Sequence, residues 1–156
     1  MNLQHDLSTS RIRRDGLSPG EMAPEFELPS VSGAPVSLSH LRGRRVLLVF
    51  SDPECGPCDS LAPRLEHLSR RTPDIDVVMI SRRTPEANAS KIREHQLTFP
   101  VLMQREREVS MRYAQFATPV AYLIDERGLI AAPAAVGVEP VLTLLRAAAI
   151  RALLES

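Results

Sequence analysis

Short apolar runs alternate along the chain with polar segments that carry apolar residues at helical spacing. Val46–Phe50 is continuously apolar, and Ile75–Ile80 is apolar apart from Asp76. Both runs are rich in β-branched residues, which is typical of strands buried on both faces of a sheet. Between these runs, Leu61, Leu65 and Leu68 recur at helical spacing. The pattern therefore predicts a strand, a helix and a second strand in the middle of the chain.

The remaining pattern extends this alternation in both directions. It predicts a β-hairpin from Phe26–Leu28 and Pro35–Leu38, a helix from Thr84 to about His95, a short strand at Phe99–Leu102, a short helix at Glu108–Phe116, a strand at Val120–Ile124 that turns back through Leu129–Ala132, and a last helix from Glu139 to Leu154. This order predicts an α/β fold, with a mixed central sheet flanked by helices on both faces and an N-terminal β-hairpin.

The length and composition of the chain fit one folded domain. The chain has 156 residues, of which 44% are apolar and 24% charged, as in an ordinary soluble globular protein. Residues 1–18 are polar and aperiodic, so we expect a flexible N-terminal arm there and a single domain over 19–156.

The charge pattern argues against several classes of partner. The formal net charge is zero, so the sequence shows no electrostatic footprint for nucleic acid or an anionic membrane. No apolar run approaches the roughly 20 residues that span a bilayer, and the polar start lacks the apolar core of a secretory signal. We expect a monomer that is cytoplasmic as written, or periplasmic or membrane-anchored if the sequence is a piece of a longer chain.

Two cysteines, Cys55 and Cys58, stand at the predicted start of the helix after the first apolar run. At such a position the unpaired backbone N–H groups and the helix dipole stabilise a thiolate, which predicts a lowered pKa for Cys55 and makes it the nucleophile. Cys58 lies one turn deeper and can resolve a mixed disulfide. Between them, Gly56 and Pro57 keep the loop compact. The pair is too close in sequence to staple a fold, so it indicates redox chemistry.

Two other interpretations of the cysteine pair remain open. A structural metal site would need two further ligands, whereas the chain has no second cysteine pair and its histidines are scattered at positions 5, 40, 67 and 95. An inert buried pair is also possible in principle, because cysteine is often a core residue. The strand–CxxC–helix context favours redox chemistry over both, and we expect no metal and no cofactor.

Several motifs together resemble the thioredoxin-like superfamily. They are the Val46–Phe50 run, the Cys-Gly-Pro-Cys segment 55–58, Pro63 inside the following helix, and Thr118-Pro119 before a strand. The front segments 20–28, 33–38 and 41–43 are similar to the redoxin branch, which holds thiol–disulfide oxidoreductases of the TlpA, ResA and MauD type and the peroxiredoxins. The similarity covers roughly residues 19–154.

The resemblance implies a thiol–disulfide oxidoreductase that reduces or exchanges disulfides, with a disulfide-containing protein or a small thiol as partner. It also implies that Pro119 is a cis-proline facing the dithiol, and that Thr118 offers its backbone to an extended partner peptide. Thr118, Pro119, Gly56 and Pro57 would then form the substrate-binding surface around Cys55.

Three positions depart from the pattern of these relatives. Val49 stands where thioredoxins have a buried Asp, Glu54 where they have Trp, and Leu61 where ResA-type proteins have Glu. The usual groups that exchange a proton with Cys58 are therefore replaced, and Asp59, Glu54 or water must take their place. This favours a narrow, client-specific exchange over a general thioredoxin.

The resemblance leaves two alternative functions. A thiol peroxidase of the peroxiredoxin branch needs a Pro-x-x-x-Thr-x-x-Cys loop, and Asp52 stands where that Thr is expected. A client-specific accessory protein would use the same dithiol during the maturation of another enzyme.

Two further groups of residues have both a functional and a plain structural interpretation. Arg82 and Arg83 follow a strand end, where α/β proteins often bind ligands, but a solvated basic loop is the simpler expectation. Tyr113 and Phe116 could line a partner groove near Thr118, although core packing is expected for both.

Overall fold

Five strands form the central sheet of the computed structural model, which describes residues 16–155. In the order of the sheet they are β5 (Val101–Met103), β4 (Ile75–Ser81), β3 (Arg45–Phe50), β6 (Val120–Ile124) and β7 (Ala135–Val136). Strands β3, β4 and β5 are parallel, whereas β6 is antiparallel to both β3 and β7. The predicted mixed sheet is therefore confirmed.

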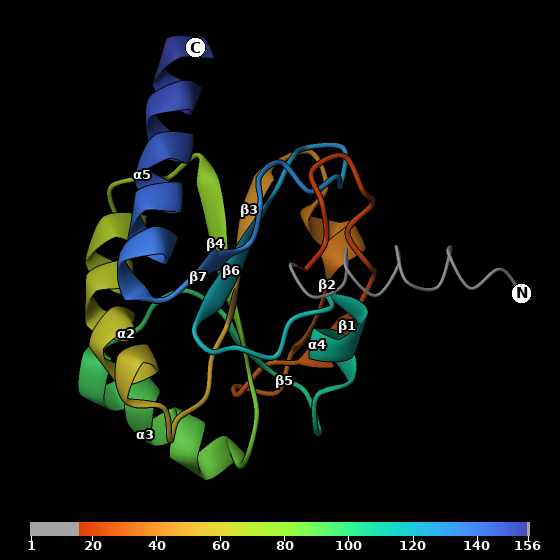
Figure 1. Cartoon of the computed structure of the whole chain (residues 1–156). Helices are drawn as coiled ribbons and strands as arrows, with labels where there is room; N and C mark the ends of the chain where they lie inside the picture. Colours follow the sequence, from red (N-terminus) through yellow and green to blue (C-terminus); the bar gives the residue numbers. More distant parts are fainter. Residues whose placement is uncertain (1–15, 156) are drawn as a thin grey trace, which may run out of the picture.

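Helices and a hairpin cover the two faces of this sheet (Figure 1). One face carries α2 (Gly56–Ser69), α3 (Pro85–His95) and α5 (Val138–Glu155). The other carries α4 (Glu108–Arg112) and the antiparallel hairpin of β1 (Glu27–Pro29) and β2 (Pro35–Ser37), followed by the 3₁₀ turn η1 (Leu38–Leu41). The thioredoxin-like arrangement and the N-terminal β-hairpin are both as predicted. None of the described helices is long and apolar enough to cross a membrane.

Each face of the sheet has its own core, because successive residues of a strand point to opposite faces. Leu47 and Val49 of β3 belong to the core beneath α2 and α5, together with Leu61, Leu65, Val141, Leu142 and Leu145. Leu48 and Phe50 belong to the core beneath the hairpin and α4, together with Phe26, Leu28, Val109, Tyr113 and Tyr122. Strand β3 is thus buried on both sides, as its continuous apolar run predicts.

Most of the predicted N-terminal arm, at residues 1–15, lies outside the described residues. Leu17, however, is only 5% exposed, and its N–H donates a hydrogen bond to the Tyr122 hydroxyl (3.0 Å). That hydroxyl in turn donates to the Tyr113 carbonyl (2.7 Å). Leu17 is therefore part of the core rather than of a flexible arm.

The helix predicted over Glu108–Phe116 is shorter than expected, because α4 ends at Arg112. Ala114 has a φ of 55°, in the left-handed region that ends a helix. Tyr113 is fully buried, which confirms its expected place in the core. Phe116 is 53% exposed, so the expectation of core packing is wrong for this residue.

The predicted strand at Leu129–Ala132 is also wrong, although the chain does turn back after β6. Among the described residues, only isolated bridges form there: one joins Ile130 to Ile124 of β6, and the other joins Leu129 to Met22. The Ile130 N–H donates to the Glu21 carbonyl instead (2.8 Å), so this segment is shared between β6 and the front of the chain. Pairing with β6 resumes at β7.

A buried carboxylate fixes α2 to the segment that precedes β5. Glu66 accepts hydrogen bonds from the Thr98 N–H (2.7 Å), the Thr98 hydroxyl (2.6 Å) and the Arg70 guanidinium (2.6 Å). Burial by itself would raise the pKa of Glu66, but these hydrogen bonds outweigh burial and lower the pKa below its ordinary value. Glu66 therefore stabilises the fold as a carboxylate.

We expect Glu66→Gln to lower the free energy of unfolding by about 1–3 kcal/mol near neutral pH, because charge-assisted hydrogen bonds are lost. The pKa of Glu66 is lower in the folded than in the unfolded chain. Its stabilisation is thus present above the unfolded-state pKa and is lost as the pH falls through the folded-state pKa. Urea unfolding at about pH 7 and about pH 3 measures this, and the difference from wild type should shrink in acid.

The control for this measurement is Glu86→Gln, which makes the same chemical change at an exposed position in the first turn of α3. It should leave the free energy of unfolding unchanged at both pH values. A destabilisation by Glu66→Gln that stayed equally large in acid would contradict the ionised role of Glu66.

Candidate active site

Three loops meet at one edge of the sheet because of the strand register. Phe50, at the end of β3, is paired with Ile80 near the end of β4 and with Val120 at the start of β6. The loop after β3, the loop after β4 and the loop before β6 must therefore lie side by side. The cysteine pair belongs to the first loop, Arg82 and Arg83 to the second, and the Thr118-Pro119 dipeptide to the third.

Cys55 caps the N-terminus of α2. Its backbone is extended, and its sulfur accepts a hydrogen bond from the Cys58 N–H at 3.2 Å. The two cysteines are joined in a disulfide, with their Cα atoms 5.2 Å apart. Cys58 is only 3% exposed, whereas Cys55 is half-buried. The pair thus presents one accessible sulfur, at a helix N-terminus, and one sulfur hidden behind it.

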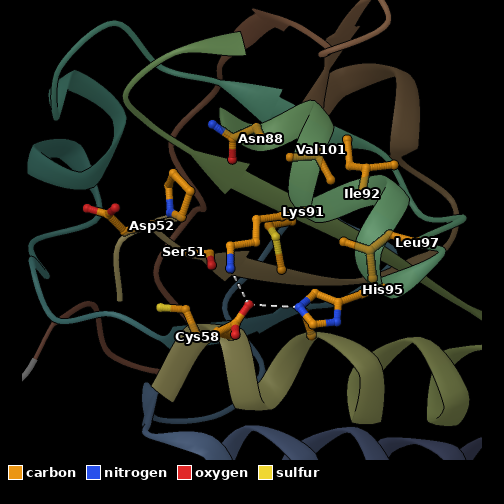
Figure 2. A pocket seen from close by; sticks show the side chains of 13 residues that line it. Ser51, Asp52, Cys58, Asn88, Lys91, Ile92, His95, Leu97 and Val101 are labelled. Carbon is orange, nitrogen blue, oxygen red and sulfur yellow. Dashed lines mark hydrogen bonds and ion pairs between the residues drawn. The ribbon is translucent and has the colours of Figure 1, made fainter. Parts of the chain in front are cut away.

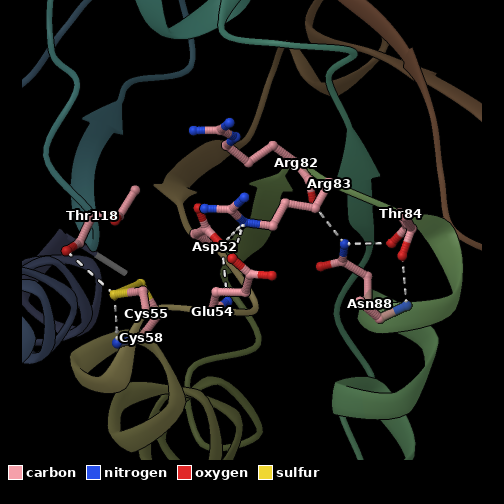
Figure 3. Close-up of polar contacts among 10 residues, drawn as sticks. Asp52, Glu54, Cys55, Cys58, Arg82, Arg83, Thr84, Asn88 and Thr118 are labelled. Atoms are coloured by element: carbon pink, nitrogen blue, oxygen red, sulfur yellow. Dashed lines mark hydrogen bonds and ion pairs between the residues drawn. A yellow bond between two sulfur atoms is a disulfide. The ribbon is translucent and has the colours of Figure 1, made fainter.

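The predicted substrate-binding residues surround the accessible sulfur. The peptide bond between Thr118 and Pro119 is cis, and the Thr118 carbonyl oxygen lies 3.5 Å from the Cys55 sulfur (Figure 3). Gly56 and Pro57 are exposed in the first turn of α2. The structure therefore places all four residues at the same end of α2 as the dithiol.

Arg83 forms ion pairs with two carboxylates beside the dithiol. Its Nε lies 2.7 Å from Asp52 and 3.1 Å from Glu54, so it bridges both (Figure 3). Asp52 also accepts a hydrogen bond from the Glu54 N–H (2.9 Å). Burial by itself would raise the pKa of Asp52, but the bonds from Arg83 and from the Glu54 N–H lower it below its ordinary value. Arg83 is thus an ion-pair residue rather than part of a freely solvated loop.

The loop that carries Arg83 is held by α3. Arg83 has a φ of 73°, a left-handed conformation that a non-glycine residue seldom adopts. The buried side chain of Asn88 donates to the carbonyls of Arg82 (2.8 Å) and Thr84 (2.9 Å), one on each side of Arg83 (Figure 3). Thr84 caps α3 by accepting from the Ala87 N–H, as predicted. These bonds fix the unusual backbone that turns Arg83 toward Asp52.

A small pocket lies behind the dithiol, between α2 and α3, and Cys58 forms part of its wall (Figure 2). Lys91 and His95 of α3 point into it and converge on Asp59 of α2, whose Oδ1 lies 2.7 Å from the Lys91 Nζ and 2.8 Å from the His95 Nε2. The hydrogen bonds from Lys91 and then His95 lower the pKa of Asp59, and the bond to Asp59 raises the pKa of Lys91. Near neutral pH the pocket that Cys58 lines therefore also holds a lysine cation.

Asp59 and His95 also belong, with Glu94, to a cluster whose potential metal-ligating atoms lie within 4.8 Å of one another. The ammonium group of Lys91 already fills the cationic role there, because it reaches both Asp59 (2.7 Å) and Glu94 (3.4 Å). A metal ion would have to displace a cation that the chain itself supplies.

Lys91 and His95 were not identified as site residues from the sequence. They are four positions apart and therefore share a face of α3. A right-handed crossover from β4 to β5 also puts α3 on the same face of the sheet as α2. Those two signals together could have placed both residues near Cys58. By contrast, the sequence positions where relatives carry an acid, Val49 and Leu61, are fully buried among apolar side chains.

A family model described as "AhpC/TSA family" matches residues 19–132. The chain is 32% identical over 134 residues to thioredoxin-like protein YneN of Bacillus subtilis, covering 83% of this chain and 76% of that protein. It is 34% identical over 137 residues to methylamine utilization protein MauD of Paracoccus denitrificans (85% and 68%). It is 36% identical over 120 residues to the putative peroxiredoxin MT2597 of Mycobacterium tuberculosis (73% and 74%).

Two proteins named for disulfide chemistry are also similar to this chain. Thiol-disulfide oxidoreductase ResA of Geobacillus thermodenitrificans is 29% identical over 114 residues, covering 71% of this chain and 66% of that protein. The crystal structure of a putative thiol:disulfide interchange protein DsbE from Chlorobium tepidum superposes with a TM-score of 0.76 at 26% identity. That superposition covers 85% of this chain and 98% of the other.

We expect Lys91→Met to raise the pKa of Cys58 by about 0.5 or more, because the pocket loses the cation that favours the thiolate. The measurement uses the reduced Cys55→Ser variant, in which Cys58 is the only thiol, and follows the ultraviolet absorbance of the thiolate against pH. Lys91→Arg keeps the charge and should restore most of the effect. An unchanged titration in Lys91→Met would show that Lys91 does not act on Cys58.

Proposed function

The chain belongs to the AhpC/TSA family, and from that premise we propose that it is a thiol–disulfide oxidoreductase with Cys55 as attacking thiol and Cys58 as resolving thiol. The observation that carries this proposal is the asymmetry of the pair. Cys55 is accessible and caps α2, where the Cys58 N–H meets its sulfur at 3.2 Å, while Cys58 is buried. The similarity to proteins named for disulfide chemistry supports the same assignment.

The first step forms a mixed disulfide. The Cys55 thiolate attacks one sulfur of a partner disulfide, and a bond forms between Cys55 and that sulfur. The partner's own disulfide bond breaks, and its second sulfur leaves as a thiolate that takes up a proton. The N–H of Cys58 stabilises the attacking thiolate before the bond forms.

The second step releases the partner. The thiolate of Cys58 attacks the Cys55 sulfur, the internal disulfide forms, and the remaining partner sulfur leaves as a thiolate that is then protonated. Two electrons pass from the Cys55–Cys58 dithiol to the partner disulfide, and the two thiol protons balance the two that the partner takes up. Run in the opposite direction, the same steps oxidise a partner dithiol.

The pocket behind Cys58 supplies the environment for the second step. Asp59 has a lowered pKa and Lys91 a raised one, so near neutral pH neither changes its charge readily. We therefore assign Lys91 the role of favouring the Cys58 thiolate by its charge, and the proton of Cys58 passes to water by way of the pocket. This replaces the expectation that Asp59 or Glu54 accepts the proton, since Glu54 pairs with Arg83 on the other side of the dithiol.

The partner we propose is an extended protein segment that contains a disulfide. Its backbone would lie along Thr118 and Pro119, which border the accessible sulfur, with Gly56 and Pro57 on the opposite side. A narrower form of this proposal is exchange with one dedicated client during the maturation of another enzyme.

A peroxidase is the second candidate, favoured by the family description and by the similarity to a putative peroxiredoxin. The position that a peroxiredoxin uses to hold peroxide is occupied here by Asp52. Its Oδ1 already accepts hydrogen bonds from Arg83 and from the Glu54 N–H. An ionised carboxylate cannot donate a hydrogen bond to peroxide, so disulfide exchange fits the site better.

We expect the wild-type protein to accelerate insulin reduction by dithiothreitol, and both Cys55→Ser and Cys58→Ser to lose this activity. The two variants should differ in the adduct that they form. Cys58→Ser should accumulate a covalent mixed disulfide with insulin, visible by mass spectrometry, because nothing resolves it. Cys55→Ser should form none, because the remaining thiol is buried.

A parallel assay follows hydrogen peroxide consumption with the same thiol donor. Loss of peroxide at a Cys55-dependent rate, without any acceleration of insulin reduction, would replace the proposed exchange by the peroxidase. Adduct formation through Cys58 in the Cys55→Ser variant would reverse the assigned roles.

A further inference from the structure

A second recess lies at the loop before β6, and it shares Ser51 and Asp52 with the Lys91 pocket. Thr118, whose carbonyl contacts the Cys55 sulfur at 3.5 Å, forms one side of it. Arg82 from the loop after β4 and Arg107 from the loop before α4 form further parts of its wall, and Phe116 completes it. The recess is therefore assembled from the loops that meet beside the attacking sulfur.

The side chains of Arg82 and Arg107 bring positive charge to this recess without being held in a direct ion pair. Within residues 16–155, no carboxylate lies within ion-pair distance of either guanidinium. This contrasts with Arg83, which pairs with both Asp52 and Glu54. The Arg107 guanidinium lies 5.9 Å from the ring centre of Phe116, over its face, which holds the charge beside the recess.

The floor of the recess carries hydrogen-bond donors that the fold leaves available. Gln104 is 3% exposed; its Oε1 accepts two N–H groups, and its Nε2 donates one hydrogen bond, to the Ser110 hydroxyl (2.9 Å). The second Nε2 proton and the Ser110 hydroxyl proton have no acceptor among the described residues. Two buried side chains, each with a donor proton to spare, thus line the same recess as the two arginines.

Asp52 is the carboxylate that lines the recess. Together with Glu54 it brings two negative charges against the three positive charges of Arg82, Arg83 and Arg107, so one positive charge remains. Arg83 and the Glu54 N–H both bond to Asp52. Figure 3 shows Arg83 on Asp52 while the guanidinium of Arg82 extends separately. The recess as a whole therefore favours a ligand that is anionic and accepts hydrogen bonds.

We propose that this recess, formed by Arg82, Arg107, Gln104, Ser110 and Phe116, binds an acidic side chain of the partner segment whose disulfide Cys55 attacks. This inference rests on the proposed function and names its substrate class: protein disulfides flanked by Asp or Glu. A carboxylate there meets two guanidinium groups and two neutral donors, and its neighbouring apolar atoms meet the exposed ring of Phe116. The segment passes Thr118 on its way from the recess to the dithiol.

The test uses two peptides of equal length that carry one central cysteine as a mixed disulfide with 2-thiopyridine, a neutral leaving group. One peptide has Glu on both sides of the cysteine and the other has Gln. Pre-reduced wild-type protein should release the thiopyridone from the Glu peptide about tenfold faster, the factor expected of one charge-assisted hydrogen bond. In the double variant Arg82→Gln/Arg107→Gln this ratio should fall to about one.

The matched control is the double variant Arg71→Gln/Arg151→Gln. It removes the same charge at exposed positions after the end of α2 and in the last turns of α5. Its ratio of Glu-peptide to Gln-peptide rates should stay at the wild-type value. An equal fall of this ratio in both double variants would show a general charge effect and would contradict binding of an acidic side chain in the recess.

Two further outcomes separate the inference from its premise. Equal rates with both peptides, each abolished by Cys55→Ser, would leave the proposed function standing and overturn the acidic substrate class. If neither peptide reacted, the proposed function would fail, and the proposed binding of an acidic side chain in the recess would fail with it. Glutathione disulfide supplies carboxylates on a small molecule. A dependence on Arg82 and Arg107 confined to that substrate would overturn binding of a protein segment.

Discussion

The position of Cys55 as the N-terminal cap of α2 is the constraint on which the chemistry of this chain depends. A helix N-terminus leaves backbone N–H groups without partners, and here the Cys58 N–H is turned onto the Cys55 sulfur. The rest of the fold holds that end of the helix in place. Strand β3 is paired on both sides, and its last residue leads directly into the loop that carries the dithiol. Glu66 fixes the last turn of the same helix to the segment before β5.

Two charge networks flank the dithiol and serve different sulfurs. On the side of Cys55, Arg83 pairs with both Asp52 and Glu54, so that these two carboxylates near the nucleophile oppose its ionisation less than they otherwise would. On the side of Cys58, Lys91 is held by Asp59 within the pocket that Cys58 lines. Both networks depend on α3 or on the loop that α3 fixes. Helix α3 thus supplies charged groups near the dithiol, which the apolar residues Val49 and Leu61 cannot do.

The sequence predicts those features that depend on short-range patterns. The buried run of β3, the helix start at Cys55 and the cap at Thr84 are all present, because each follows from a few neighbouring residues. Features that depend on distant parts of the chain were harder to predict. The strand expected at Leu129–Ala132 fails because Glu21 takes the hydrogen bond of Ile130. Likewise, the convergence of Lys91 and His95 on Asp59 depends on how two helices pack, which no local motif reveals.

The family resemblance predicted the cis peptide bond at Thr118-Pro119, which the spacing of residues by itself does not indicate. An ordinary turn is the simpler interpretation of Thr118-Pro119 in isolation, whereas the resemblance predicts a cis bond beside the dithiol, and the bond is cis. The resemblance did not indicate the exposure of Phe116, nor that Arg82 and Arg107 lack direct ion pairs, since these features belong to this chain's own loops.

The activation of Cys55 by the helix N-terminus is tested most directly by alkylating the reduced wild-type protein over a range of pH and mapping the modified cysteine. Modification should begin at Cys55, with a midpoint below the free-thiol pKa of about 8.5; a midpoint at or above that value, or modification of Cys58 first, would contradict this activation.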